Sequence, residues 1–339
     1  MKAAQFSLMW QFNYRIVLFI VLTSAAIGAA LFLNNENKGI IIMPNPLISG
    51  TPTESPASNA VKMVFVGDIM LSRSVGAKMS ELNDFRYPFR KIADYLNSFD
   101  LAFANLETPI SDRGVKVGSI YSFRSDPRSV DGLNFGGIDV VSLANNHIWD
   151  YGREAFADTM KHLNNGGIDY IGAGSYEHVH QGVVKEIKNT KIGFLAYTNL
   201  APRGTAATPQ SAGVGFIDTD QLAQDIKNLK MRSDIVIISF HFGDEYKQQH
   251  NSYQENISEL AINSGADLVV GHHPHVVQEV EKYKNGWIAY SLGNFIFDQN
   301  FSKETMEGLV LEVDVRGDEI ISVRSRKINI SKNYQPSFE

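Results

Sequence analysis

The sequence predicts an α/β protein in which buried strands alternate with amphipathic helices. Three observations predict this class. Short apolar runs rich in β-branched residues recur from Val61 onward, segments with helical apolar spacing separate them, and the final segment changes to two long strand-like runs. Alternating strands and helices favour a layered α/β architecture. The two final runs add antiparallel pairing, so we expect mixed sheets rather than a purely parallel one.

Seven runs predict the buried strands. Their apolar side chains are continuous rather than alternating, which is typical of strands covered on both faces. These runs are residues 62–66, 100–104, 138–143, 169–171, 191–197, 234–239 and 267–270.

Four segments have the apolar spacing of helices, residues 88–99, 153–165, 218–230 and 253–264. Asp218 is a plausible N-cap for the third of them, and Gly166 and Gly265 fit helix ends. Residues 308–315 and 319–330 flank the turn sequence Arg-Gly-Asp and predict a β-hairpin.

The N-terminal sixty residues predict a membrane anchor and a tether. Residues 16–33 form an uncharged apolar run of about 18 residues, close to the length that spans a bilayer. Lys2 and Arg15 precede this run, so the positive-inside rule places residues 1–15 in the cytoplasm and the rest of the chain outside it. The alternative is a signal peptide cleaved after the small residues at 28–30, followed by secretion.

The expected linker and domain boundaries after residue 33 follow from the anchor. Residues 34–60 carry four prolines among Ser, Thr and Asn, which is typical of a flexible linker. Residues 61–332 are then the expected extracytoplasmic domain of a single-pass protein of the cell membrane.

Composition restricts the chemistry. The formal net charge of −6 gives no basic footprint for nucleic acid, so we expect no nucleic-acid partner. The chain has no cysteine, which excludes disulfides, a lipid-modified cysteine anchor and thiolate metal ligands. Any metal ligands must therefore be histidine, carboxylate, amide or water.

The strongest functional signal is the sequence G-H-H-P-H-V-V-Q at residues 271–278. It places three of the nine histidines within four positions, directly after the expected strand 267–270. Imidazole is the commonest protein ligand for a transition metal, and a strand end can direct such side chains into one pocket. Taken alone, the cluster could also be a surface feature without function.

Polar residues also follow most of the other expected strands, where open α/β sheets bind ligands. They are Asp68, Asn105, Glu107, Asn145, Asn146, His147, Asp150, His241, Glu245 and Asn294. Each alone has an ordinary explanation as a turn, a cap or a solvated loop residue. Those explanations do not predict that all of them fall at strand ends, so together they predict one functional site. His162, His178, His180 and His250 lack this placement and are expected at the surface.

In this order, the motifs resemble those of the CapA family of bacterial poly-γ-glutamate capsule synthesis proteins. The resemblance covers about residues 61–298. It rests on V-G-D-I-M at 66–70, N-L-E-T-P at 105–109, S-L-A-N-N-H at 142–147 with Asp150 and Gly152, H-F-G-D-E-Y at 241–246, G-H-H-P-H at 271–275 and Y-S-L-G-N-F at 290–295. That family in turn resembles calcineurin-type metallophosphoesterases, which implies a four-layer α/β/β/α sandwich of two mixed sheets after one transmembrane helix.

The resemblance also implies residue roles. The metal-ligand candidates are Asp68, Glu107, Asn146, His241, His273 and His275, with His272 competing for one place. His147, oriented by Asp150, matches the histidine that assists catalysis by donating a proton to the leaving group. The weaker, substrate-holding candidates are Asn105, Arg124, Asn145, Glu245 and Asn294. One or two divalent ions (Mn, Zn, Fe or Mg) would lower the pKa of a bound water.

Two departures from the phosphoesterase pattern concern the number of ions. Met70 stands where that pattern has a histidine, and Asn-Leu-Glu at 105–107 replaces a segment with aspartate after glycine. One metal position has therefore lost a nitrogen ligand. Two alternatives to a two-metal site are therefore open: a mononuclear site, or an oxygen-rich site for Mn or Mg.

Three functions compete. The leading hypothesis is an anchored, outward-facing component of the synthesis or export of poly-γ-glutamate or a related anionic polymer, working with a membrane synthase complex. The second is a free-standing metal-dependent hydrolase of phosphate esters or amide-linked polymers. The third is a non-catalytic scaffold that binds the polymer. The sequence leaves open whether the protein is an enzyme.

Overall fold

The computed structural model describes residues 59–117 and 120–338, which belong to one compact unit, Ser55–Glu339. The expected cytoplasmic segment 1–15, the membrane segment 16–33 and nearly all of the linker lie outside the described residues. Among the helices of the described part, none has the length and apolar character needed to cross a bilayer.

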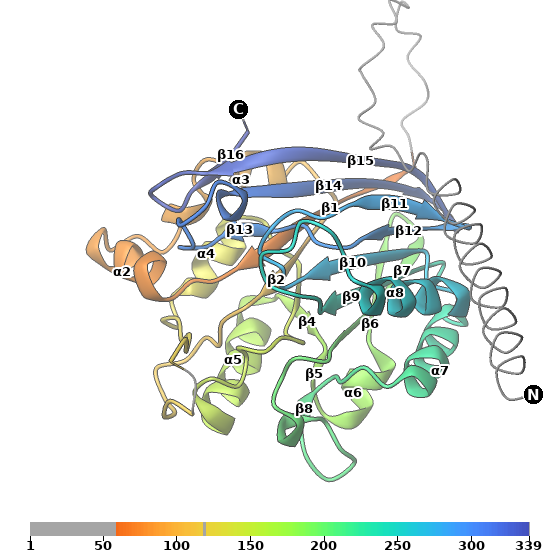
Figure 1. Cartoon of the computed structure of the whole chain (residues 1–339), viewed down its shortest axis with the longest axis horizontal. Coiled ribbons are helices and arrows are strands. Elements are labelled where there is room, and N and C mark those ends of the chain that lie inside the picture. The colour runs from red at the N-terminus through yellow and green to blue at the C-terminus, as the bar shows by residue number, and fades with distance from the viewer. Residues whose placement is uncertain (1–58, 118–119, 339) are drawn as a thin grey trace, which may run out of the picture. The chain divides into compact units, whose positions relative to one another are not determined.

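The larger of the two main sheets has eight strands in the order β16-β15-β14-β1-β2-β3-β4, with β13 also pairing with β1 (Figure 1). The strands are β1 (Val61–Ile69), β2 (Leu101–Leu106), β3 (Val140–Ser142), β4 (Asp169–Ile171), β13 (Asn294–Ile296), β14 (Glu307–Arg316), β15 (Glu319–Ile330) and β16 (Pro336–Ser337). Strands β1 to β4 and β13 run parallel, whereas β14, β15 and β16 pair antiparallel. The sheet is therefore mixed, as the sequence predicts.

The second main sheet has six strands in the order β11-β12-β10-β9-β7-β6. The strands are β6 (Val183–Ile187), β7 (Thr190–Thr198), β9 (Ile235–His241), β10 (Leu268–His272), β11 (Val280–Tyr283) and β12 (Gly286–Ala289). Parallel pairing joins β7, β9, β10 and β12, and antiparallel hairpins add β6 and β11 at the edges. A separate two-stranded sheet pairs β5 (Ala173–Gly174) with β8 (Gly213–Val214).

The two main sheets share one hydrophobic core. Its buried residues include Phe65 and Phe103 from the larger sheet and Phe194 and Leu268 from the smaller one. The rings of Phe103 and Phe194 stack with centroids 6.1 Å apart and planes within 4° of parallel. Burial of this much apolar surface is the main force that holds the sheets together.

Helices cover the other face of the smaller sheet. A second core joins Ile238 and Val269 of that sheet to Leu222, Ile226 and Ala261. The helical side chains among these come from α7 (Thr219–Lys230) and α8 (Ser252–Ser264). Figure 1 shows α8 close to β9, with α7 next to it, and α6 (Tyr176–Gln181) packs against α7 and β7. The α/β class with two mixed sheets is therefore confirmed.

Three predicted helices form, α5 (Gly152–Gly166), α7 and α8. Their ends agree with the expected ones, except that Gly167, with a φ of 73°, caps α5 in place of Gly166. The Asp218 side chain accepts a hydrogen bond from the Gln221 backbone nitrogen at 3.0 Å, as an N-cap does. Gly265 ends α8 with a φ of 115°, a left-handed conformation that favours glycine.

The helix predicted over residues 88–99 is wrong. The segment forms a 3₁₀ turn, η1 (Tyr87–Phe89), and a single turn of helix, α3 (Ala93–Leu96). Phe89, Ile92 and Leu96 are all buried, which explains the helical spacing. At Ile92, however, φ is −124°, outside the helical range, so packing rather than a continuous helix places these side chains.

Several elements were not predicted. They are α2 (Arg73–Glu81), α4 (Ser129–Phe135), α6, η2 (Arg203–Thr205), η3 (Glu304–Met306) and the strands β5, β6, β8, β11, β12, β13 and β16. Most of these are short, and strands β6 and β11 are only partly buried, so neither continuous apolar runs nor clean alternation marks them.

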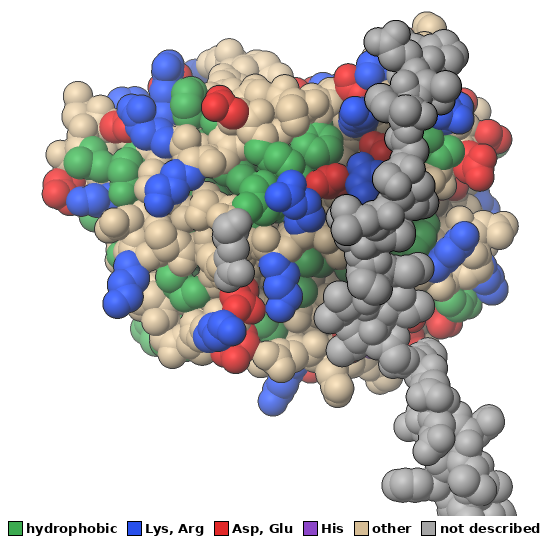
Figure 2. Space-filling model, turned by 90° about the horizontal axis from the view of Figure 1, so that it is seen from above, with side chains coloured by type: hydrophobic (Ala, Val, Ile, Leu, Met, Phe, Trp, Pro, Cys, Tyr) green, Lys and Arg blue, Asp and Glu red, His purple; other side chains and the backbone are tan. Residues whose placement is uncertain are grey.

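The hairpin predicted near the C-terminus is confirmed as β14 and β15, joined by a turn in which Gly317 has a φ of 59°. Most side chains of β15 are exposed or half-buried. Arg324 donates hydrogen bonds to Glu312 and Asp314 at 3.1 and 3.0 Å. Figure 2 views the molecule from above Figure 1, from the side on which β15 lies, and shows basic and acidic side chains interspersed.

Candidate metal and catalytic site

Strand register brings two sets of polar residues together, one on each main sheet. In the larger sheet, Asp68 of β1 lies beside Asn105 of β2 and Asn294 of β13. In the smaller sheet, His241 and His272 are register partners at the ends of β9 and β10. All five side chains are buried.

The loop after β10 supplies two further imidazoles. His273 and His275 have φ angles of 99° and 58°, which few residues other than glycine adopt. Asp68 accepts a hydrogen bond from the backbone nitrogen of His273 at 3.3 Å, and Nδ1 of His275 lies 3.0 Å from Oδ1 of Asn294. The loop is thus fixed to the larger sheet, although its strand belongs to the smaller one.

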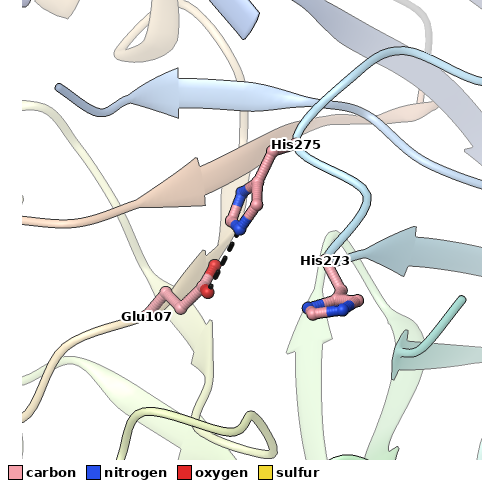
Figure 3. A group of neighbouring side chains, drawn as sticks. All are labelled: Glu107, His273 and His275. Atoms are coloured by element: carbon pink, nitrogen blue, oxygen red, sulfur yellow. Dashed lines mark ion pairs between the residues drawn. The ribbon is translucent and has the colours of Figure 1, made fainter. Parts of the chain in front are cut away.

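Glu107, directly after β2, lies at the centre of the cluster. Its Oε1 atom is 3.8 Å from Nε2 of His147, 3.8 Å from Nε2 of His241 and 3.7 Å from Nε2 of His275. Figure 3 shows the carboxylate directed at His275, with His273 nearby on the same loop. Oε1 is fully buried and makes no hydrogen bond within the described part of the chain.

These distances fit a divalent cation. Ligand atoms of Glu107, His273 and His275 all lie within 4.8 Å of one another, and so do those of Asp68, Glu107 and His241. Two ligands each about 2.1 Å from an ion are themselves roughly 3–4 Å apart. The oxygen and nitrogen donors are those that Mn, Fe and Zn accept.

The electrostatics also fit a cation. Burial raises the pKa of Glu107 well above its ordinary value, and the charge of Asp68 adds to this rise. Burial lowers the pKa of His241, and it lowers that of His273 to about 3, so both imidazoles are neutral. Burial alone would raise the pKa of Asp68, but the neighbouring imidazoles of His272 and His275 hold it well below its ordinary value. A positive ion would relieve the penalty on the buried carboxylates.

Two other metal-ligand candidates lie beside these groups. Asn146 Oδ1 is 2.7 Å from Nε2 of His241. Nδ1 of His272 is 3.3 Å from Oδ1 of Asp68, although neither ring nitrogen of His272 makes a hydrogen bond within the described residues. The structure therefore brings all seven candidates into one cluster, and their role as ligands stays a prediction.

His147 and Asp150 form a hydrogen-bonded pair at the edge of the cluster. Nδ1 of His147 is 2.8 Å from Oδ2 of Asp150, which also accepts a hydrogen bond from the backbone nitrogen of Phe123. The ring of Phe123 stacks on the imidazole with centroids 3.9 Å apart. Nε2 is left to face Glu107, an arrangement suited to proton transfer within the site.

Buried amides support the ligands. Asn105 donates to Asp68 at 2.8 Å and accepts from Asn145 at 3.2 Å. Asn145 Oδ1 in turn accepts hydrogen bonds from the backbone nitrogens of His147 and Ile148. Asn105, Asn145 and Asn294 are fully buried, so in this arrangement they orient ligands, and their predicted substrate contacts stay a prediction.

The last two substrate-holding candidates, Arg124 and Glu245, are not among the buried side chains of the cluster. Arg124 donates to the backbone oxygens of Arg113 and Gly114 at 3.0 and 3.2 Å, so its polar contacts are outside the cluster. Glu245 is exposed, and its charge contributes to the raised pKa of Glu107.

Sequence reasoning missed several neighbours of the site. They are Arg73, Phe123, Tyr246 and Phe297, whose contacts with site residues join distant parts of the chain.

Met70, which replaces a histidine of the phosphoesterase pattern, accepts hydrogen bonds on sulfur from the backbone nitrogen and hydroxyl of Ser72 at 3.2 and 3.1 Å.

The four histidines expected at the surface are half-buried instead. Three of them bind nearby groups: His178 lies 3.0 Å from the Tyr170 oxygen, His180 lies 2.6 Å from Asp225, and His250 lies 3.2 Å from Glu279. These contacts fix local structure, which sequence spacing cannot show.

Comparison with known proteins gives a family match. Residues 62–299 match the family model described as bacterial capsule synthesis protein PGA_cap. The chain is 31% identical over 268 residues to capsule biosynthesis protein CapA of Bacillus anthracis, covering 76% of this chain and 65% of that protein. It is 31% identical over 250 residues to PGA biosynthesis protein CapA of Bacillus subtilis (strain 168), covering 73% of this chain and 66% of that protein. The chain thus spans slightly less than two thirds of either relative.

Among solved structures, the calcineurin-like phosphoesterase YfkN from Bacillus subtilis aligns with 82% of this chain and 93% of its own, at 13% identity. The TM-score of 0.42 is too low to establish a shared fold.

Proposed function

The chain belongs to the bacterial capsule synthesis protein PGA_cap family, and we propose that it is a membrane-anchored, extracytoplasmic component of poly-γ-glutamate synthesis or export. The match over residues 62–299 supports this role, as do the two relatives, one named for capsule biosynthesis and the other for PGA biosynthesis. The apolar run at residues 16–33 supports the anchor. A related anionic polymer and a membrane synthase partner belong to the same proposal.

The second part of the proposal is that the domain is a metallophosphoesterase-like sandwich with a hydrolytic metal site. One observation carries it: Oε1 of Glu107 is buried, receives no hydrogen bond from residues 59–117 or 120–338, and faces three imidazole nitrogens at 3.7–3.8 Å. Glu107, His273 and His275, or Asp68, Glu107 and His241, would hold one or two divalent ions. Such an ion supplies Lewis acidity toward a carbonyl or phosphoryl group and toward water.

The chain's own residues would then handle the proton. Asp150 accepts from Nδ1 of His147 and so fixes the tautomer and the ring orientation. Phe123 stacks on the ring and keeps Nε2 directed into the cluster. Nε2 can therefore carry a proton to the leaving group of a cleaved bond, as a general acid.

The test replaces the gene with a His147→Ala version and measures both polymer on the cell surface and divalent metal per purified full chain. We expect the polymer phenotype to change while metal content stays at the wild-type level. His162→Ala is the matched control, since His162 lies on α5 outside the cluster.

Three other outcomes have definite meanings. An unaltered phenotype in His147→Ala, with metal bound, would favour the non-catalytic scaffold. Absence of metal from the wild-type chain after incubation with Mn, Zn and Fe would overturn the metal site. Unchanged surface polymer after deletion of the gene would overturn the role in polymer synthesis or export.

A further inference from the structure

Arg73 has an unusual backbone conformation shortly after the strand that carries the metal-ligand candidate Asp68. It is the first residue of α2, which follows the strand that carries Asp68. Its φ of 48° is left-handed, a conformation that residues with a side chain seldom adopt. Such outliers persist only where surrounding contacts enforce them, and they cluster at functional sites.

An ion pair with Asp298 enforces the position of the side chain. The Arg73 guanidinium donates to both carboxylate oxygens of Asp298, through Nε at 3.2 Å and through Nη2. Asp298 is held in turn by the backbone nitrogen of Ser74 at 3.1 Å, and its side chain is only 5% exposed. Within the described residues the side-chain hydrogen bonds of Arg73 run through Nε and Nη2, which leaves Nη1, and the side chain is 31% exposed. One end of the guanidinium is therefore oriented and available.

Two phenylalanines connect this guanidinium to the cluster. Its central carbon lies 4.8 Å from the ring centroid of Phe123 and 5.9 Å from that of Phe297. Phe123 stacks on His147 at 3.9 Å, and Phe297 contacts the ring of His275 at 4.8 Å. The arginine and the candidate general acid His147 thus both contact Phe123, and the arginine and the candidate metal ligand His275 both contact Phe297.

The charge of the polymer indicates what Arg73 would recognise. A γ-linked glutamate chain keeps one free carboxylate on every residue. In the proposed site a metal ion would face the reacting bond, so the free carboxylates of the neighbouring residues need a separate, fixed positive group at the edge of the cluster. Arginine suits carboxylates because its charge is permanent and its donors are planar.

We propose that Arg73 is a substrate-recognition residue that donates from Nη1 to a free carboxylate of the polymer chain at the edge of the metal cluster. Asp298 is a positioning residue that sets the orientation of the guanidinium. This inference rests on the proposed function, because it takes the polymer as the substrate.

The test measures binding of a γ-linked glutamate decamer to the metal-loaded full chain by calorimetry. We expect Arg73→Gln to weaken binding about tenfold or more, the usual effect of losing a hydrogen bond between charged groups. Arg73→Lys should restore part of the affinity, and Asp298→Asn should weaken binding while leaving the arginine in place. A decamer with amidated carboxylates should bind weakly to the wild type and equally weakly to Arg73→Gln.

Arg86→Gln is the matched control. Arg86 also pairs with an aspartate, Asp131, at 2.7 and 2.8 Å and lies 5.6 Å from a phenylalanine ring, that of Phe135, but it lines a separate surface pocket. Its replacement should leave decamer binding unchanged. Metal content and thermal unfolding of each variant show whether a loss of binding is a loss of structure.

Two results would overturn the inference, and they differ in what else they affect. If the wild type binds the decamer and folded, metal-loaded Arg73→Gln binds it equally well, the role of Arg73 falls and the proposed function stands. If the metal-loaded wild type binds no decamer, the polymer assignment falls and this inference with it.

Discussion

At the scale of single residues, the site depends on one buried carboxylate. Glu107 lies near His241 and His273, whose pKa values are lowered by burial, and its Oε1 atom has no hydrogen-bond donor within the described structure. Burying an ionised group without a partner is costly, so without a metal ion the protonated form is favoured. Folding and metal binding are therefore linked through this proton.

The linkage predicts a pH dependence. Because burial raises the folded-state pKa of Glu107, its contribution to stability is present at acid pH and is lost as the pH rises through that value. Without metal, the free energy of unfolding of the wild type should therefore fall with increasing pH relative to that of Glu107→Gln. Denaturant unfolding in the presence of a chelator, at acidic and mildly alkaline pH, measures this difference. A constant difference between the two proteins would contradict the assignment of the charge penalty to Glu107.

A second prediction concerns the His147–Asp150 pair. Asp150→Asn removes the carboxylate that fixes the His147 tautomer, so hydrolysis should slow by about a hundredfold or more while metal content is unchanged. Release of glutamyl fragments from poly-γ-glutamate is the measurement. Asp169→Asn is the control, since the ion pair of Asp169 with Lys185 is partly exposed and distant in sequence from the motifs. Equal rates for the wild type and Asp150→Asn would remove the pair from the mechanism.

Individual site residues could be predicted from sequence where the signal is local. Three histidines within four positions, directly after an apolar run, predict a cluster without any structure. The pair of Arg73 and Asp298 could not be predicted, because 225 positions separate its members and neither belongs to a recognisable spacing. Phe123 lies only 27 positions from Asp150, but a single phenylalanine belongs to no recognisable spacing either.

At the scale of elements, the site requires strands to approach each other closely. Gly67 in β1 and Gly271 in β10 both lie against backbone oxygens, where an added Cβ would come within 1.9 Å of Gly293 and Tyr290 respectively. Neither glycine has a positive φ, so close packing rather than conformational freedom requires it. This packing sets the register that places Asp68 beside Asn294.

We therefore predict that Gly67→Ala lowers the free energy of unfolding by about 3 kcal/mol, the upper range for overpacking, because a backbone oxygen cannot move aside as a side chain can. Metal affinity should fall as well, since Asp68 follows Gly67 directly. Gly204→Ala is the control, because a Cβ there meets no atom within 4 Å. Denaturant unfolding and metal titration measure the two effects. Wild-type stability in Gly67→Ala would show that β1 and β13 can separate without cost.

Elements were predictable where their burial was uniform. Strands β1, β7, β9 and β10 are buried along nearly their whole length and stand out as apolar runs. Strand β13 has three residues, so the sequence marks it only as the end of the motif Y-S-L-G-N-F, although it pairs with β1 beside Asp68. Residues 88–99 have helical spacing without a helix, because the core accepts the same side chains from two short turns.

At the scale of the whole molecule, neither sheet contains the site alone. Asp68, Asn105 and Glu107 come from the larger sheet or directly follow it, whereas His241 and the histidine loop come from the smaller one. The shared core between the sheets therefore also sets distances within the cluster. A cavity in that core far from the cluster would be expected to loosen the site as well as the fold.

The last prediction concerns how the domain is attached to the cell. Residues 16–33 are apolar over about 18 residues, which as a helix would span about 27 Å, close to the thickness of about 30 Å of a hydrocarbon core. We expect the full chain to stay in the membrane fraction after an alkaline wash and its domain to be cleaved by protease added outside intact cells. A chain lacking residues 1–33 should stay in the cytoplasm and resist that protease, because it has neither anchor nor export signal. A shortened protein in the medium that begins just after the small residues at 28–30 would show instead that the segment is a cleaved signal peptide. The domain would then act on polymer without being held beside a membrane synthase.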